Sequence, residues 1–86
     1  MTNSETQKFI NPDKSVKAEV RETMQVAYQA LKEKGYNPFS QIVGYILSGD
    51  PTYITGHMNA RAMMSKIDRD ELLEELVRFY VIKTTD

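Results

Sequence analysis

The chain has 86 residues, which is enough for one small domain with a core near the lower size limit for independent folding, so self-association is expected. It contains no cysteine, which excludes disulfides and thiolate metal sites and makes the cytoplasm the expected location. Its 11 basic and 12 acidic residues leave a net charge of −1, which gives no overall attraction to nucleic acid or anionic lipid. The sequence contains neither the run of roughly 18 apolar residues that a membrane span needs nor a signal-like N-terminus.

The N-terminal residues 1–14 are mostly polar and contain only two large apolar side chains, Phe9 and Ile10. This composition predicts a flexible tail over residues 1–14, followed by a single helical domain over residues 15–86. Thr2, Ser4 and Thr6 lie in this tail, where hydroxyl groups are accessible to a kinase but are also commonplace.

The first predicted helix begins at Ser15, whose hydroxyl can cap an unpaired amide of the first turn. Large apolar residues then recur at spacings of three and four, which is typical of one buried helical stripe. These residues are Val16, Val20, Met24, Tyr28 and Leu31. Gly35 is expected to end the helix in the left-handed conformation.

The second predicted helix starts at Pro38, with Asn37 as its cap, and runs to about Ser48. Its apolar residues lie on nearly every side, which predicts burial on more than one face and a central place in the fold. Small residues follow one another four apart at Ser40, Gly44 and Ser48. Because glycine inside a helix costs about 1 kcal/mol relative to alanine, we expect this strip to permit a close contact, either within the protomer or across a dimer axis.

Two shorter elements are predicted next. Asp50 can cap a brief helical turn that begins at Pro51, and a third helix is expected over residues 60–67 with Asn59 as its cap. No segment alternates with the period of a strand.

A fourth helix is predicted to start at Asp68, which forms a capping-box pattern with Glu71, and to fade near Lys83. Its apolar stripe consists of Leu72, Leu73, Leu76, Val77 and Tyr80. The sequence therefore predicts an all-α fold, a small bundle of about four to five short helices with a flexible N-terminal tail.

No catalytic, cofactor-binding or metal site is predicted. His57 is the only histidine, so a zinc site would need mostly carboxylate ligands. The acidic run over residues 68–75 lies at a helix N-terminus, where the helix dipole favours negative charge, so a metal-dependent hydrolase is the weakest interpretation. The turn Ser48-Gly49-Asp50 has no general base nearby in the sequence, and cap roles account for its residues.

Two interpretations remain from the residues alone. Short helices separated by turns at Gly49 and Gly56 are compatible with a small helix-turn-helix nucleic-acid-binding protein, although the acidic composition argues against it. Alternatively, Arg61, Lys66 and Arg69 form a local basic face that binds a protein partner. If they are merely solvated, replacing Arg61 by alanine should change stability by no more than about 0.5 kcal/mol.

Several motifs resemble one family closely. The segments KGYNP (34–38), QIVGY (41–45), LSGDP (47–51) and YI (53–54), followed by NAR (59–61), RDE (69–71) and EELV (74–77), are similar to the signature of the IreB family of Gram-positive bacteria. Members are also called ReoM and YrzL. The match covers about residues 31–80, and ETQKF (5–9) resembles the N-terminus of the family.

The resemblance implies a helical homodimer that is not an enzyme and that regulates peptidoglycan synthesis and tolerance of β-lactams such as cephalosporins. The threonine matching Thr6 is the target of a membrane-anchored Ser/Thr kinase with PASTA repeats, and a PP2C-type phosphatase reverses the modification. In some relatives the unphosphorylated form promotes proteolysis, by Clp machinery, of the enzyme that commits UDP-N-acetylglucosamine to peptidoglycan.

The resemblance also bears on the basic face. Arg61 matches the family pattern, and Lys66 keeps a charge where relatives have arginine. Relatives carry further arginines where this chain has Gly56 and Ser65, so its basic face contains fewer positive charges.

Overall fold

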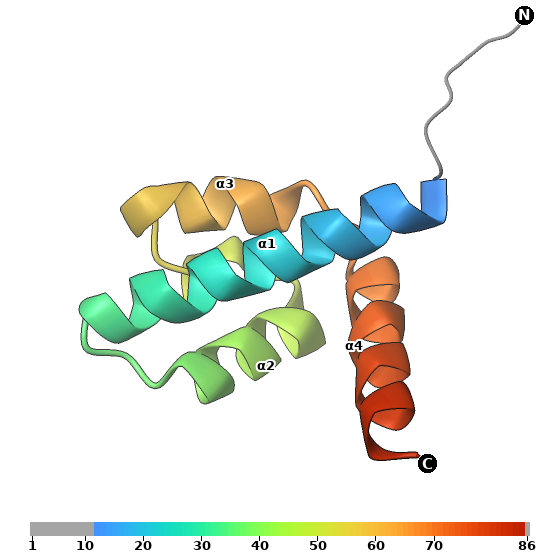
Figure 1. Cartoon of the computed structure of the whole chain (residues 1–86). Coiled ribbons are helices and arrows are strands. Elements are labelled where there is room, and N and C mark those ends of the chain that lie inside the picture. Colours follow the sequence, from blue (N-terminus) through green and yellow to red (C-terminus); the bar gives the residue numbers. More distant parts are fainter. Residues whose placement is uncertain (1–11, 86) are drawn as a thin grey trace, which may run out of the picture.

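The computed structural model describes residues 12–85, with side chains from Val16 onward. Within these residues the chain forms four α-helices and two 3-10 helices and has no strand, which confirms the predicted all-α fold (Figure 1). The elements are α1 (Pro12–Glu33), α2 (Pro38–Ser48), η1 (Pro51–Tyr53), η2 (His57–Asn59), α3 (Ala60–Ser65) and α4 (Arg69–Thr84). No helix among them is both long and apolar enough to cross a bilayer.

The helix α1 begins earlier than predicted. It starts at Pro12, so the expected cap Ser15 lies inside the helix, and residues 12–14 of the predicted tail are helical. Proline suits the first helical position because its missing N–H would have no partner there. The end is as predicted, since Gly35 has φ 85° and Tyr36 N donates to Leu31 O at 3.0 Å.

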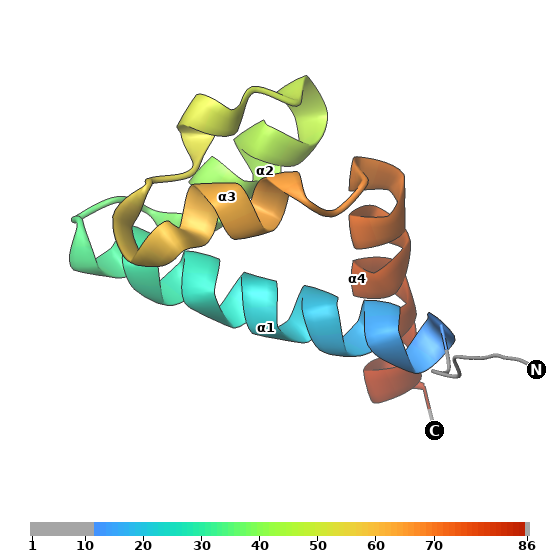
Figure 2. The ribbon, with the colours of Figure 1, turned by 90° about the horizontal axis from the view of Figure 1, so that it is seen from above.

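The central element is α1, not α2 as the sequence predicted. It packs against α2, α3, α4 and η2, and the two views agree that α2 and α3 lie on the same side of α1 while α4 crosses near its N-terminal half (Figure 2). Its buried stripe consists of Val20, Thr23, Ala27, Ala30 and Leu31. Ala27 and Ala30 are fully buried and small, which lets the backbones of neighbouring helices approach closely.

The helix α2 has the predicted bounds and cap. The side chain of Asn37 accepts hydrogen bonds from Phe39 N and Ser40 N, and Gly49 ends the helix with φ 76°. Only one face is buried, by Ile42 and Tyr45. The prediction of burial on several faces is therefore wrong within the protomer, and the outer face of α2 is exposed and apolar.

The close contact expected at Gly44 is made within the protomer, by an aromatic ring of η1. An added Cβ at Gly44 would lie 2.5 Å from Tyr53 Cε1. The side-chain Nε2 of Gln41 also donates to Tyr53 O at 2.9 Å and holds η1 against α2. The hydroxyls of Ser40 and Ser48 donate to backbone oxygens of their own helix turn, at Asn37 (3.3 Å) and Gly44 (2.7 Å).

The link from η1 to α3 contains the short helix η2, which the sequence did not predict. Met58 and Asn59 both have positive φ, 57° and 64°, and Asn59 makes no side-chain cap bond. The helix α3 ends at Ser65, two residues before the predicted 67. His57 Nε2 lies 2.7 Å from Glu33 Oε1 and ties η2 to the end of α1, and hydrogen bonds from Gln29 and His57 lower the pKa of the Glu33 carboxyl.

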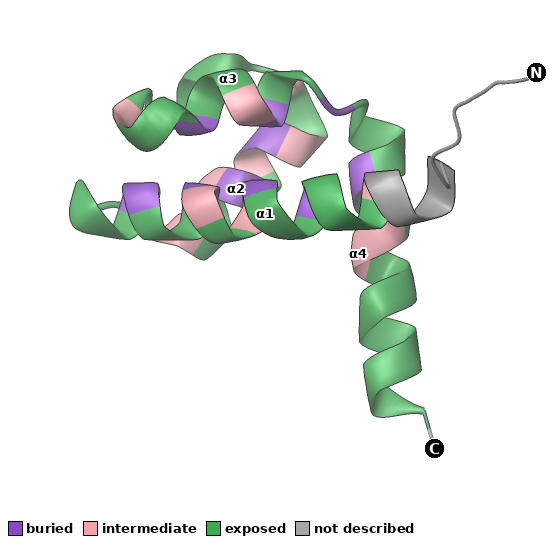
Figure 3. Cartoon of the chain, turned by 45° about the horizontal axis from the view of Figure 1, so that its top comes forward, coloured by how far each residue is buried: buried purple, intermediate pink, exposed green. Residues whose placement is uncertain are grey.

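The burial of α4 decreases along the helix toward its C-terminal end. Leu72 is fully buried and Leu76 half-buried, whereas the C-terminal half is exposed (Figure 3). Asp68 occupies the N-cap position, but its side chain accepts no capping hydrogen bond, so the predicted capping box does not form. The predicted apolar stripe is buried only in part, because Leu73, Val77 and Tyr80 face outward.

The contact at Gly44 gives a prediction about stability. Gly44→Leu should displace the Tyr53 ring and destabilise the fold by about 1–3 kcal/mol, which in a domain of this size lowers Tm by roughly 4–8 °C per kcal/mol. The matched control is Gly56→Ala, because Gly56 has ordinary helical angles and nothing lies within 4 Å of an added Cβ. The control should be neutral or stabilising by up to about 1 kcal/mol in thermal unfolding. Equal Tm values for the two variants would contradict the packing described here.

Candidate protein-binding surfaces

The polar side chains of the turn Ser48-Gly49-Asp50 form local capping hydrogen bonds. Ser48 Oγ accepts from Asp50 N at 3.0 Å, and Asp50 Oδ1 accepts from Thr52 N at 2.9 Å and from Thr52 Oγ1 at 2.7 Å. These bonds from Thr52, with a smaller contribution from the charge of Arg61, lower the pKa of the Asp50 carboxyl. In the part of the chain that the structure describes, no three histidines or carboxylates gather as a metal site would require.

Arg61 is anchored to the backbone. It lies in the first turn of α3, and its Nε donates to Ile54 O at 2.8 Å in a partly buried hydrogen bond. Its own amide donates to Thr55 O at 3.1 Å. Removing the side chain would leave the Ile54 carbonyl without this partner, so Arg61→Ala should cost more stability than an ordinary exposed substitution.

Arg69 joins the end of α2 to the start of α4. Its Nη1 donates to Ile46 O at 2.8 Å, and its guanidinium lies against Gly49, where an added Cβ would be 2.8 Å from Arg69 Cζ. A positive charge is favourable at this place because the carbonyl end of α2 carries the negative end of the helix dipole.

Arg61 and Arg69 donate to the backbone oxygens of Ile54 and Ile46, whereas Lys66 follows the end of α3. Five residues separate Arg61 from Lys66, which corresponds to about 140° around a helix. Lys66 is exposed, and within the described residues it forms no ion pair. The three cations therefore belong to one region without sharing one helix face. Thr2, Ser4 and Thr6 lie outside the described residues.

The helix-turn-helix interpretation gains no support from α3. This helix has six residues, and its one cation, Arg61, is bonded to Ile54 O. A recognition helix instead presents several side chains to the base edges of a groove.

An exposed apolar face that the sequence analysis missed runs over α2 and α4. On α2 it consists of Phe39, Val43 and Leu47, which are 69%, 53% and 79% exposed. On α4 it continues through Leu73, Val77 and Tyr80. A hollow lined by Ile46, Asp68, Arg69, Asp70 and Leu73 lies where the end of α2 comes near the start of α4. We call these six side chains the α2/α4 face; the apolar character of α2 on nearly every side was its signal in the sequence.

A groove of about 490 Å³ lies between α1 and α4. Val20 and Met24 from α1 and Leu76 and Phe79 from α4 form its apolar floor. Its rim carries three cations, Lys17, Arg21 and Lys83, and one acid, Glu75. The sequence analysis missed this α1/α4 groove, because its two walls are more than 50 residues apart in the chain.

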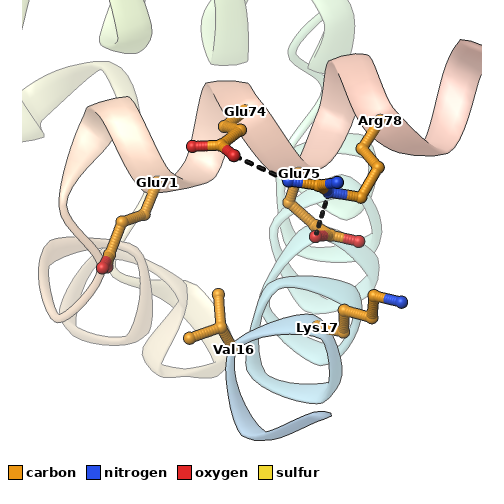
Figure 4. A pocket seen from close by; sticks show the side chains of 6 residues that line it. All are labelled: Val16, Lys17, Glu71, Glu74, Glu75 and Arg78. Atoms are coloured by element: carbon orange, nitrogen blue, oxygen red, sulfur yellow. Dashed lines mark hydrogen bonds and ion pairs between the residues drawn. The ribbon is translucent and has the colours of Figure 1, made fainter. Parts of the chain in front are cut away.

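The other end of the same helix crossing is acidic. Figure 4 shows Glu71, Glu74 and Glu75 on α4 above Val16 and Lys17, with Arg78 between two of the acids. Arg78 Nη2 lies 2.7 Å from Glu74 Oε2, and Arg78 Nε lies 3.9 Å from Glu75 Oε1. The carboxylates there are partly neutralised by Arg78, whereas the cations of the α1/α4 groove have no such partner among the described residues.

Comparison with known proteins identifies relatives over nearly the whole chain. A family model described as "IreB regulatory phosphoprotein" matches residues 4–82. A UPF0297 protein of Acetivibrio thermocellus is 59% identical over 81 residues, covering 94% of this chain and 89% of the relative. One from Lachnoclostridium phytofermentans is 60% identical over 62 residues (72% and 70%). One from Ruminiclostridium cellulolyticum is 56% identical over 69 residues (80% and 78%).

These similarities, together with the all-α fold, define a small helical regulatory phosphoprotein. The chain belongs to the IreB family, which confirms the resemblance of its motifs. The matched range includes Ser4 and Thr6 and begins after Thr2.

The contact between Arg69 and Gly49 gives a second prediction. Arg69→Ala should destabilise the fold by about 0.5–1.5 kcal/mol, because Ile46 O loses its partner, while the exposed Lys66→Ala control should stay within about 0.5 kcal/mol. Gly49→Ala should cost about 1–2 kcal/mol from its positive φ, and more while the Arg69 guanidinium is present. Urea unfolding of the double-mutant cycle at fixed protein concentration measures this coupling, and strictly additive effects would contradict the contact.

Proposed function

We propose that this protein is a non-enzymatic regulator of peptidoglycan synthesis and β-lactam tolerance, switched by phosphorylation of Thr6 and acting in the cytoplasm by binding other proteins. The observation that carries the proposal is its membership of a regulatory phosphoprotein family over a range that contains Thr6. The local hydrogen bonds of Ser48, Asp50 and Thr52 support it, since each of these side chains already has a structural role in the turn.

The proposed partners follow from the resemblance of the motifs. A PASTA-type Ser/Thr kinase adds the phosphate to Thr6, with Ser4 and Thr2 as further candidate acceptors, and a PP2C-type phosphatase removes it. Clp protease machinery and a peptidoglycan-precursor enzyme are the further proposed partners. Arg61, Lys66 and Arg69 are the proposed contact residues, and the hydrogen bonds to Ile54 O and Ile46 O fix the directions of the two arginine side chains.

We further propose that the protein is a homodimer paired through the α2/α4 face. A chain of 86 residues buries little apolar surface on its own, and this face leaves six large side chains in water. Clusters of large exposed apolar side chains are typical of protein interfaces. The small-residue strip of α2 lies beside this face, but its Gly44 contact is within the protomer.

The dimer proposal predicts the effect of a charge in the face. Val43→Glu or Val77→Glu should raise the dimer dissociation constant by about 30-fold or more, because a carboxylate would be desolvated in the interface. The control is Ile82→Glu, since Ile82 is 64% exposed on another side of α4. Light scattering coupled to gel filtration gives the mass, and circular dichroism confirms that helix content is kept. Dimers of wild-type stability in both face variants would refute the interface.

The regulatory proposal is tested by complementing a deletion strain and measuring sensitivity to cephalosporins. Thr6→Ala should abolish kinase-dependent changes in sensitivity, and mass spectrometry should place the phosphate on Thr6 in the wild type. Arg61→Gln with Lys66→Gln should lose regulation, because glutamine can still donate to Ile54 O but carries no charge. Arg78→Gln is the control, as Arg78 pairs with Glu74 elsewhere on the surface. Full complementation by the Arg61/Lys66 variant would show that these cations are not the working surface.

A further inference from the structure

The α1/α4 groove combines an apolar floor with cations that form no ion pair within the part of the chain that the structure describes. Lys17, Arg21 and Lys83 against Glu75 leave a formal charge of 3 − 1 = +2 around a floor that includes Phe79 and Met24. The floor is accessible, since Phe79 is 52% exposed. Lys83 Nζ lies 5.6 Å from the centre of the Phe79 ring, which holds one cation directly over the floor. Such a groove suits an extended segment that carries both a phosphate and large apolar side chains.

We propose that the occupant of this groove is the N-terminal segment of the same chain, residues 1–11, docked after phosphorylation of Thr6. This inference rests on the proposed function, in that it assumes phosphate on Thr6. The segment has the required chemistry, because Phe9 and Ile10 follow Thr6 by three and four residues. Its phosphate would lie among the cations of the rim and its apolar residues on the floor.

The length of the segment permits this docking. The helix α1 begins at Pro12, and the first groove residues, Lys17 and Val20, lie about 8 and 12 Å along it. Three extended residues reach about 10 Å, so the backbone of Phe9 can reach the level of Lys17, at the near end of the groove, when the chain turns back at Pro12. Six residues reach about 20 Å, so Thr6 can reach Arg21, about 14 Å along the helix. The segment is therefore long enough to bring both Phe9 and Thr6 to the groove.

Phosphorylation makes the charge of residues 1–11 negative, which is opposite in sign to the charge of the α1/α4 groove. Glu5 and Lys8 cancel, so the side chains of residues 1–11 are neutral before modification. A phosphate adds about −1.5 to −2 at neutral pH, which balances the +2 of the groove. The unmodified segment gains only apolar contact, whereas the modified one also gains charge-assisted hydrogen bonds. Docking is thus coupled to modification.

The proposed docking leaves the α2/α4 face open. Phe79 follows Val77 by two residues, which places the two side chains about 200° apart around α4. The groove and the face therefore use different sides of the same helix, and phosphorylation need not break a dimer.

The test uses the full chain with phosphothreonine installed at position 6 by genetic encoding. The chain has no cysteine, so Asn3→Cys provides one site for a nitroxide label, and relaxation of backbone amides reports where the label lies. In the phosphorylated protein, enhanced relaxation should concentrate on residues 17–25 and 75–83, and the unmodified protein should show about tenfold less docking. Raising salt from 0.05 to 0.5 M should weaken the effect, because these charges are exposed.

Matched variants decide the outcome. Arg21→Gln with Lys83→Gln should reduce docking about tenfold or more, while Lys32→Gln with Lys34→Gln, which removes the same charge from exposed positions outside the groove, should not. Enhancement centred on residues 61–69, enhancement spread evenly over the chain, or insensitivity to the Arg21/Lys83 change would overturn the proposal. A kinase that leaves Thr6 unmodified would instead refute the proposed function, because the installed phosphothreonine does not depend on a kinase.

Discussion

Close packing against two alanines of α1 is the constraint on which the rest of the fold depends. Ala27 and Ala30 are fully buried, and α2, α3 and η2 all contact this helix. The largest fully buried side chains come from different elements, with Leu31 on α1, Ile54 after η1 and Met64 on α3. These side chains belong to one core cluster that also contains both alanines, whose small size permits close approach of the helix backbones. In a core this small, one added methylene group has few places to go.

The small size of the core also explains where the exposed apolar surfaces lie. After Leu72 and Leu76, α4 has no more core to contact and continues outward with apolar residues on several sides. One side, with Phe79, forms a wall of the α1/α4 groove, and another, with Val77, belongs to the α2/α4 face. A helix that is poorly buried by its own protomer thus provides both of the apolar surfaces available for binding.

Local signals in the sequence predicted the elements better than the surfaces. Asn37-Pro38 gave the start of α2 correctly, because capping depends only on neighbouring residues. Pro12 carried a similar helix-start signal, preceded like Pro38 by asparagine, and the prediction overlooked it in favour of Ser15. The hydrogen bond of Arg69 has an acceptor 23 residues away, and the groove joins helices from the two ends of the chain. Such features depend on tertiary packing, and no local pattern reports them. The tail hydroxyls lie outside the described residues, so their roles stay predictions.

The stack of Arg69 on Gly49 has a consequence for how this sequence can diverge. Gly49 is needed twice, for its positive φ of 76° and for the space that the guanidinium occupies. Arg69 in turn has its place because no Cβ fills that space. A change at either position removes the reason for the other, so the two should drift as a pair over evolutionary time. The contact between the start of α4 and the end of α2 therefore depends on two residues that are twenty positions apart in the chain.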